Sequence, residues 1–249
     1  MFAVVAMGVP GPEQGPRPGS GRVESTPIVV ELFTSEGCES CPPADVLLQR
    51  LASAQPVSGA QIIPLSLHVD YWDQLGWKDR FSSAALTNRQ RTYGSRFHTD
   101  DIYTPQMVVD GRSAFVGSDA DAARKAIAKA ATAAHGGMRI ERAGSAVTVT
   151  ATDLPNHDRA DIVVALAEDH LTSKVTRGEN HGRTLTHTAV VRTLAVVGEA
   201  AGRTAEARST LAIDPAWKRE ELRIVAFVQE RRGGAILASA MVPLEPARP

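Results

Sequence analysis

The chain has 249 residues, of which 43% are apolar and 22% are charged, and its formal net charge is -1. This composition fits one large domain or two modest ones, each able to bury a core, and excludes a disulfide-rich miniprotein. Because 27 basic residues balance 28 acidic ones without runs of like charge, we expect no nucleic-acid partner. Every apolar stretch is well short of the roughly 20 residues that cross a bilayer, so we expect no membrane span.

Residues 1–27 differ in composition from the rest of the chain. Met1–Val9 is apolar like the middle of a signal peptide, but no basic residue precedes Arg17. This segment is either a signal peptide that starts further upstream or a short cytosolic tail. We favour the signal peptide, and with it a periplasmic or secreted protein, although the cytoplasm is not excluded. Half of the residues from Gly8 to Pro27 are Gly or Pro, which predicts a linker.

Residues 28–137 alternate between β-prone and helix-prone segments. The run Ile28–Phe33 is typical of a strand buried on both faces, and Asp110-Gly111 predicts a tight hairpin with positive φ. The elements expected in this half are a strand at Ile28–Phe33, a helix at Pro42–Ala52, a strand at Gln61–Val69, a helix at Ser82–Tyr93, strands at Gln106–Val109 and Ser113–Val116, and an Ala-rich helix from Ser118 to about Ala134, closed by Gly136 and Gly137.

From Met138 onward the pattern changes to short β segments separated by turn residues. We therefore expect an α/β domain over residues 28–137, followed by a smaller, mostly antiparallel β domain over residues 138–249. The expected strands of the second domain are Ala146–Ala151, Asp161–Leu166, Thr184–Leu194, Arg223–Gln229 and Ile236–Val242.

The only two cysteines form the motif Cys38-Glu39-Ser40-Cys41, between the first expected strand and the first expected helix. A disulfide across so short a loop stabilises little, so a chemical role is expected. A helix N-terminus favours the reactive thiolate, which makes Cys38 the expected nucleophile and Cys41 the resolving thiol. The carboxylates of Glu36 and Glu39 oppose this effect, because nearby negative charges raise a thiol pKa. We therefore expect the redox potential of a moderate reductant or of an isomerase.

Three interpretations of the cysteine pair stay open. The favoured one is a thiol-disulfide oxidoreductase without a cofactor, acting on a protein or small-thiol disulfide. A second is a copper or zinc carrier, in which His68 or another histidine joins Cys38 and Cys41 as a ligand. The third is a protein-interaction module in which the cysteines are incidental. The sequence leaves the oligomeric state open.

The dipeptide Thr104-Pro105 stands directly before the third expected strand. With the order of elements and the C-x-x-C motif, it resembles the thioredoxin superfamily. The resemblance implies a cis-proline at Pro105 that faces the cysteines, although cis X-Pro bonds are rare, and backbone groups of Thr104 that receive substrate. It also implies that Glu31, a buried acid below the site, accepts a proton from the resolving thiol. The alternative for Glu31 is a carboxylate at a sheet edge.

A closer resemblance covers about Ile28 to Val242. Four blocks in order resemble a bacterial, usually exported, thioredoxin-like family named domain of unknown function 1223. This resemblance implies a fold and little about activity. The blocks are Val30–Asp45, His68–Asp79, Tyr103–Gly111 and Gly178–Arg192.

Two further segments are rich in candidate residues. The aromatic residues Tyr71, Trp72 and Trp77 follow the second expected strand, and they would hold an apolar peptide or small thiol, or else anchor the loop in the core. A polar turn in the second half marks either a site or a contact that docks the two halves, and we favour the contact. Its members are Glu179, Asn180, His181, Arg183 and His187.

Overall fold

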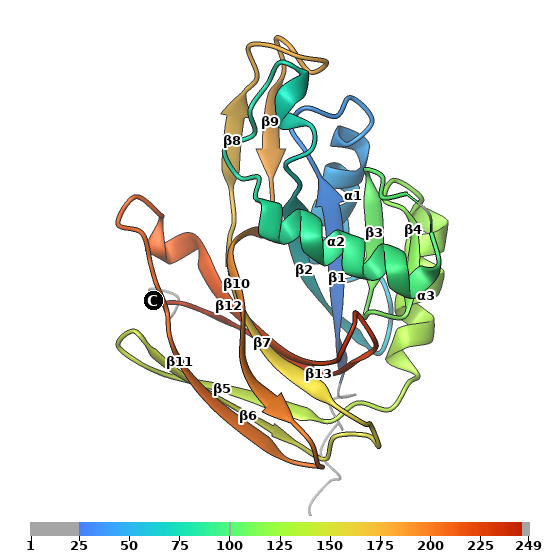
Figure 1. The fold of residues 1–249 in the computed structure, drawn as a ribbon, viewed down its shortest axis with the longest axis vertical. Helices are drawn as coiled ribbons and strands as arrows, with labels where there is room; N and C mark the ends of the chain where they lie inside the picture. The colour runs from blue at the N-terminus through green and yellow to red at the C-terminus, as the bar shows by residue number, and fades with distance from the viewer. Residues whose placement is uncertain (1–24, 100, 246–249) are drawn as a thin grey trace, which may run out of the picture.

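The computed structural model describes residues 25–99 and 101–245 (Figure 1). The signal-like segment Met1–Val9 lies outside these residues. The protein has a mixed α/β fold with one large sheet and few helices. Within the described residues, none of the helices is both long and apolar enough to cross a membrane.

One eight-stranded sheet has the order β13-β12-β7-β10-β2-β1-β3-β4. A three-stranded sheet has the order β11-β6-β5, and β8 and β9 form a hairpin. The first half contains β1 (Thr26–Thr34), α1 (Pro42–Ala54), β2 (Ala60–His68), α2 (Ala84–Phe97), β3 (Gln106–Val109), β4 (Ser113–Val116) and α3 (Ala120–Ala131). The second half contains β5 (Gly137–Ala143), β6 (Ala146–Thr152), β7 (Ala160–Glu168), β8 (Leu171–Lys174), β9 (Thr184–His187), β10 (Val190–Ala200), β11 (Ala205–Thr210), β12 (Leu222–Glu230) and β13 (Ile236–Pro243).

The helices cover both faces of the first half of the sheet. Alternate side chains of β1 point to opposite faces, as a strand requires. Val30 and Leu32 pack with α1 and α3, whereas Val29 and Phe33 pack with α2. This arrangement confirms the prediction that the first strand is buried on both faces, and it places the end of β1 between two helix layers.

The large sheet continues across the boundary predicted between residues 137 and 138. Strand β10 runs parallel to β2 through the pair Val190 and Ser66, and the Ser66 N–H donates to the Ala189 carbonyl at 2.8 Å. An unpaired edge strand favours pairing with another strand, which explains why β10 of the second half adds to β2 of the first half. Four strands of the second half, β7, β10, β12 and β13, thus extend the first sheet, while β5, β6 and β11 form a sheet of their own.

The second half differs from the sequence prediction in several elements. The single strand predicted at Thr184–Leu194 is two strands, because Ala189 has a φ of 51° and breaks the run. Strands β5, β8 and β11 were not predicted. Gly137 was predicted to end the Ala-rich helix, but that helix ends at Ala131, and Gly137 is the first residue of β5. The hairpin β8-β9 rises beside the amino end of α1, at the top of Figure 1.

Candidate active site

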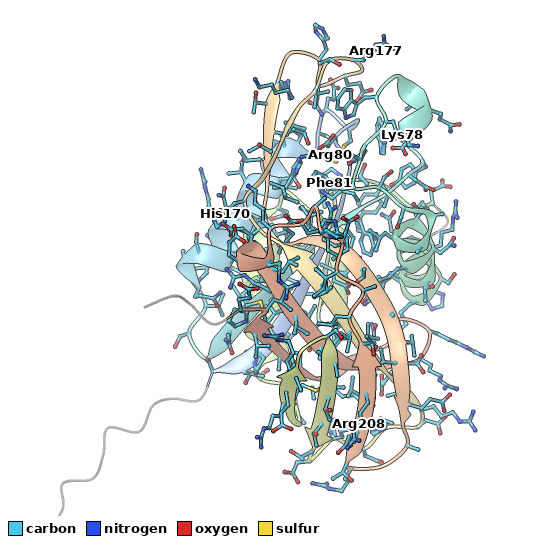
Figure 2. The ribbon with its side chains drawn as sticks, turned by 90° about the vertical axis from the view of Figure 1, so that its left-hand side faces the viewer. Lys78, Arg80, Phe81, His170, Arg177 and Arg208 are labelled. Atoms are coloured by element: carbon cyan, nitrogen blue, oxygen red, sulfur yellow. A yellow bond between two sulfur atoms is a disulfide. The ribbon has the colours of Figure 1, made fainter. Side chains whose placement is uncertain are left out.

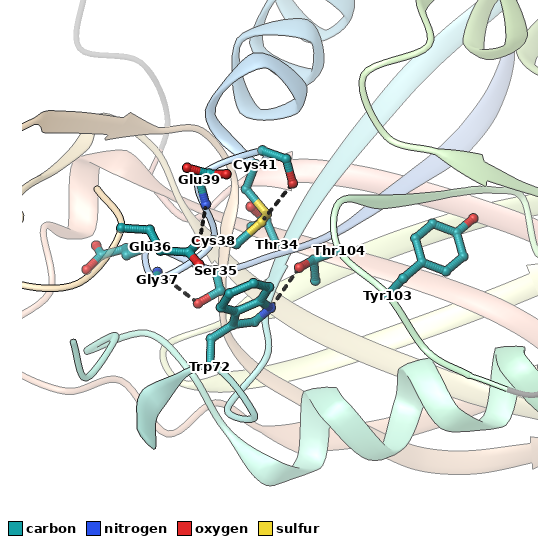
Figure 3. Close-up of a disulfide and its surroundings, with 12 residues drawn as sticks. Thr34, Ser35, Glu36, Gly37, Cys38, Glu39, Cys41, Trp72, Tyr103 and Thr104 are labelled. Atoms are coloured by element: carbon teal, nitrogen blue, oxygen red, sulfur yellow. Dashed lines mark hydrogen bonds between the residues drawn. A yellow bond between two sulfur atoms is a disulfide. The ribbon is translucent and has the colours of Figure 1, made fainter. Parts of the chain in front are cut away.

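The cysteines lie in a tight loop, residues 35–41, between β1 and α1. Cys38 and Cys41 form a disulfide with a Cα–Cα distance of 5.5 Å (Figure 3). The Cys38 N–H donates to the Ser35 carbonyl at 3.2 Å, and the Cys41 N–H donates to the Cys38 carbonyl at 3.3 Å. Both cysteines are fully buried. The backbone therefore fixes the two sulfur positions, and the surrounding protein covers them.

The first turn of α1 offers Cys38 little direct stabilisation. Cys41 is the N-cap residue, and Pro42 and Pro43 have no N–H to donate. The next N–H group, that of Ala44, donates to the Cys41 carbonyl at 2.9 Å. No N–H of the first turn is left to face a Cys38 thiolate, so only the helix dipole acts from this side.

Ser40 supplies a polar contact that the sequence analysis missed. Its Oγ lies 3.3 Å from Cys38 Sγ, within hydrogen-bonding distance for sulfur. A serine hydroxyl can donate to a thiolate, and such a charge-assisted bond favours the anion. The signal in the sequence was a hydroxyl two residues after the expected nucleophile.

Thr104 and Pro105 directly precede β3. The Thr104-Pro105 peptide bond is cis, as predicted. The Pro105 carbonyl accepts from the Gly117 N–H at 2.9 Å, and a Cβ added at Gly117 would lie 3.0 Å from Pro105 and 3.3 Å from Ala44 of α1. Trp72 Nε1 donates to Thr104 Oγ1 at 2.8 Å, and Figure 3 shows this pair beside the disulfide.

The aromatic residues after β2 are half-buried and anchored. Tyr71 and Trp72 pack against the core that α2 covers, and the Tyr71 hydroxyl donates to Gln90 Oε1 at 3.3 Å. Burial raises the Tyr71 pKa above its ordinary value. Trp77 Nε1 donates to Glu36 Oε2 at 2.7 Å. The core-anchoring alternative thus describes their packing, and their role toward a substrate stays a prediction.

A loop from the second half covers the cysteine loop. The Asn180 side-chain amide donates to the carbonyls of Glu36 and Cys38, each at 2.9 Å, and Asn180 is fully buried. Glu179 Oε2 accepts from the Glu39 N–H at 3.0 Å. These bonds confirm that the polar turn docks the second half onto the first.

Buried charges surround this contact. His68 Nδ1 lies 2.6 Å from Asp79 Oδ2, and His187 Nε2 lies 3.2 Å from Glu36 Oε1. Asp79 Oδ2 also accepts from the Glu36 N–H at 2.9 Å. Burial alone would raise the pKa of both carboxyl groups, but hydrogen bonds from His187 and Trp77 hold the Glu36 pKa below its usual value, and His68 does the same for Asp79. The cysteine loop therefore contains one buried carboxylate, that of Glu36, and is bonded to a second, that of Asp79.

Glu31 does not reach the disulfide. It is fully buried in a central strand, so the sheet-edge alternative is wrong, but it lies on the face of the sheet that α2 covers. There Arg89 Nε and Nη2 donate to its two carboxylate oxygens at 2.5 Å and 2.9 Å, and the Tyr93 hydroxyl donates to it as well. Glu31 is the acceptor of a buried ion pair.

Asp45 is an acid in the first turn of α1, four residues after the resolving cysteine. Its N–H donates to the Cys41 carbonyl at 3.1 Å. Its Oδ2 accepts from Thr34 Oγ1 at 3.3 Å. Burial raises the pKa of Asp45 to about 7, against a smaller opposite effect of His187. The signal that the sequence analysis missed was the spacing of four from Cys41.

The ligand set considered for a metal is not assembled. The two sulfurs are bonded to each other, and His68 Nδ1 is engaged with Asp79. Over residues 25–99 and 101–245, no three His, Cys, Asp or Glu side chains are grouped so as to hold a metal ion.

Comparisons with known proteins identify structural relatives. A protein of Agrobacterium tumefaciens, solved by a structural genomics consortium, is 27% identical with a TM-score of 0.72, and the match covers 90% of this chain and 97% of that one. HBP35 of Porphyromonas gingivalis is 13% identical with a TM-score of 0.61 over 90% of this chain and 77% of that one, which shows a shared fold alone. No curated protein matches. The model of the family described as protein of unknown function DUF1223 matches residues 29–229, and the chain belongs to that family.

Proposed function

We propose that this protein is a thiol-disulfide oxidoreductase whose first half is a thioredoxin-like unit. The observation that carries the proposal is the disulfide between the only two cysteines, at the start of α1, and the cis peptide bond before Pro105 supports it. Two cysteines spaced in this way exchange disulfides through a mixed-disulfide intermediate. The proposed substrate is a protein or small-thiol disulfide, and the chemistry needs no cofactor.

The proposed reaction starts from the reduced protein. The Cys38 thiolate attacks one sulfur of the substrate disulfide, forms a mixed disulfide and releases the other sulfur as a thiolate. The Cys41 thiolate then attacks Cys38 Sγ, and the second substrate thiolate leaves as the internal disulfide forms. The substrate gains two electrons and the protein loses two. An external dithiol returns the protein to its reduced state by the reverse sequence.

Asp45 replaces Glu31 as the proposed proton acceptor in this reaction. The resolving thiol has to lose a proton before it attacks, and an acceptor works best when its pKa is near the working pH. The Asp45 pKa of about 7 fits that requirement. Ser40 Oγ, 3.3 Å from Cys38 Sγ, has the matching task of stabilising the first thiolate.

The burial of the disulfide limits which partners reach it. Because Cys38 is fully buried beneath Asn180 and its loop, a bulky substrate gains access only when that loop moves. Small thiols are therefore the proposed first reactants. Trp72, bonded to Thr104 beside the disulfide, is the proposed contact of the aromatic residues with substrate.

The proposed location is the periplasm or the cell exterior. The apolar segment Met1–Val9 supports this location, as does the resemblance to a usually exported family. Disulfide chemistry suits an oxidising compartment, where such bonds persist.

A redox titration tests the proposed function. Purified protein is equilibrated in glutathione buffers, free thiols are alkylated, and the modified Cys38 and Cys41 are counted by mass spectrometry. We expect a reversible two-electron couple between about -270 and -180 mV. A disulfide that resists reduction below about -300 mV would be a structural bond, and the proposal would then fail.

Two cysteine variants test which cysteine is the nucleophile and which is the resolving thiol. Cys41→Ser should trap a mixed disulfide between Cys38 and glutathione, because the resolving thiol is gone. The matched Cys38→Ser variant should trap far less, since Cys41 is not the proposed nucleophile. Equal trapping in both variants would contradict the assigned roles.

A further inference from the structure

A second site lies outside the disulfide loop. A cavity of about 380 Å³ opens between the start of α2, strand β10 and Trp217, and none of the residues lining it belongs to the cysteine loop. This volume is within the range of small-molecule sites. Figure 2 shows Arg80 and Phe81, which help to line the cavity, next to each other in the upper part of the molecule.

Two arginines converge on this cavity around one aromatic ring. The guanidinium carbon of Arg80 lies 4.6 Å from the centre of the Phe81 ring, and that of Arg192 lies 5.3 Å from the same centre. The guanidinium carbon of Arg192 also lies 4.8 Å from the centre of the Trp217 ring. Aromatic faces attract each cation, but the two like charges repel one another. Burial, with Arg80 beside it, lowers the Arg192 pKa from its usual value, although Glu168 and Asp214 act in the opposite direction.

The nearby carboxylates only partly compensate these charges. Arg192 Nε lies 3.5 Å from Glu168 Oε2, which is long for a charge-assisted hydrogen bond, and the other Glu168 oxygen accepts from the Lys218 N–H at 3.1 Å. Arg80 donates one hydrogen bond, to the Thr172 carbonyl at 2.8 Å. Among residues 25–99 and 101–245, the Arg192 guanidinium donates no side-chain hydrogen bond, and its ion pair with Glu168 is its nearest charged contact. The cavity therefore presents free guanidinium donors.

We propose that this cavity binds a small organic monocarboxylate with a planar apolar body. The carboxylate accepts from the guanidinium groups of Arg80 and Arg192, whose fork geometry suits it. The apolar body lies against Trp217 and Leu194, which line the same space. Glu168 beside Arg192, and Asp214, whose charge also acts on Arg192, disfavour a ligand of higher negative charge, so a singly charged carboxylate fits this cavity better than a phosphate. This binding site is independent of the proposed redox chemistry.

Titration with a matched pair of probes tests the site. The oxidised full-length protein is titrated with phenylacetate and with its neutral isostere phenylacetamide, while the indole N–H resonance of Trp217 is followed by NMR. We expect saturable binding of phenylacetate that shifts this resonance, and at least about tenfold weaker binding of the amide, because a charge-assisted hydrogen bond is lost. Equal affinity for the two probes, or no saturation, would overturn the proposal.

Variants assign the binding to the two arginines. Arg80→Gln and Arg192→Gln should each weaken phenylacetate binding by about tenfold or more. Arg208→Gln is the matched control, since Arg208 is exposed and lies far from Arg80 in Figure 2, and its affinity should stay within about twofold. Arg192 packs in the fold, so the more exposed Arg80 keeps the test valid if Arg192→Gln fails to fold. Unchanged affinity in Arg80→Gln would exclude the assigned site.

Discussion

The side-chain amide of Asn180 donates to the Cys38 carbonyl at 2.9 Å across a sequence separation of 142 residues. The same nitrogen donates to the Glu36 carbonyl, so one buried amide closes the second half of the chain over the cysteine loop. Buried polar groups are seldom left without partners, and Asn180 supplies one to the Glu36 carbonyl and a second one to the Cys38 carbonyl, which also accepts from the Cys41 N–H. The contact therefore has two effects: it satisfies carbonyls of the cysteine loop, and it holds the loop of the second half over that segment.

Replacement of Asn180 by alanine should expose the disulfide. The variant loses both hydrogen bonds to the cysteine loop, and the covering loop then opens more often. We expect reduction by dithiothreitol to become about tenfold faster, which corresponds to roughly one net hydrogen bond. The measurement is a time course of alkylation, read by mass spectrometry.

His181→Ala provides the control for this experiment. His181 belongs to the same loop but is exposed, so its removal should leave the rate of reduction unchanged. If Asn180→Ala and His181→Ala are reduced at the same rate, Asn180 does not hold the cover.

The strand, loop and helix around the cysteines were predictable because their signals are local. The β-prone run before Ser35 and the two prolines after Cys41 bracket the loop, and the structure places β1 and α1 within two residues of the predicted ends. The pairing of β10 with β2 was not predictable, because it depends on a contact between residues far apart in sequence.

The choice between Glu31 and Asp45 also needed the structure. The alternation of β1 places Glu31 on the face of Val29 and Phe33, but no local pattern tells which helix covers that face. It is α2, which brings Arg89 to Glu31 and leaves the other face to α1. Burial, one of the two alternatives for Glu31, is confirmed, but the neighbour of its carboxylate is Arg89 and not the resolving cysteine.

Removal of the Glu31 charge should destabilise the fold without slowing disulfide exchange. Glu31→Gln leaves the Arg89 guanidinium buried without its counterion, which costs about 3 kcal/mol in the free energy of unfolding. Urea denaturation measures this loss. The rate of glutathione exchange per folded molecule should stay that of the wild type.

The double variant Glu31→Gln with Arg89→Met tests the cause. It removes both charges, and a large part of the lost free energy should return, because no unpaired charge remains. A double variant no more stable than Glu31→Gln would show that the ion pair is not the source. A slower exchange rate in folded Glu31→Gln would restore Glu31 as a proton acceptor.

Asp45 should make the protein less stable as the pH rises. Its pKa is about 7 in the folded protein, against 3.8 for the ordinary carboxyl group. Between these values the folded state holds a proton that the unfolded state has released, so the free energy of unfolding falls from about pH 4 to about pH 7. Asp45→Asn removes this contribution while keeping an oxygen that accepts from Thr34.

The comparison of wild type with Asp45→Asn isolates this effect. Urea denaturation at about pH 5 and about pH 8 should show the variant gaining stability over the wild type at the higher pH, by a few kcal/mol at most. His135, whose pKa Asp110 raises against the effect of burial, adds a decline with pH in both proteins, and it cancels in the difference. A difference that stays constant with pH would contradict a raised Asp45 pKa.

Ser40 should set the reactivity of the reduced Cys38. Pro42 and Pro43 donate no N–H and Ala44 donates to Cys41, whereas the Ser40 hydroxyl lies 3.3 Å from the Cys38 sulfur and can donate to it. Ser40→Ala should raise the Cys38 pKa and slow its alkylation by iodoacetamide several-fold at neutral pH, since the thiolate is the reacting form. The pH profile of alkylation measures the shift, and Ser40→Thr, which keeps the hydroxyl, should restore it. If the profiles of wild type and Ser40→Ala coincide, stabilisation of the thiolate comes from the helix dipole alone.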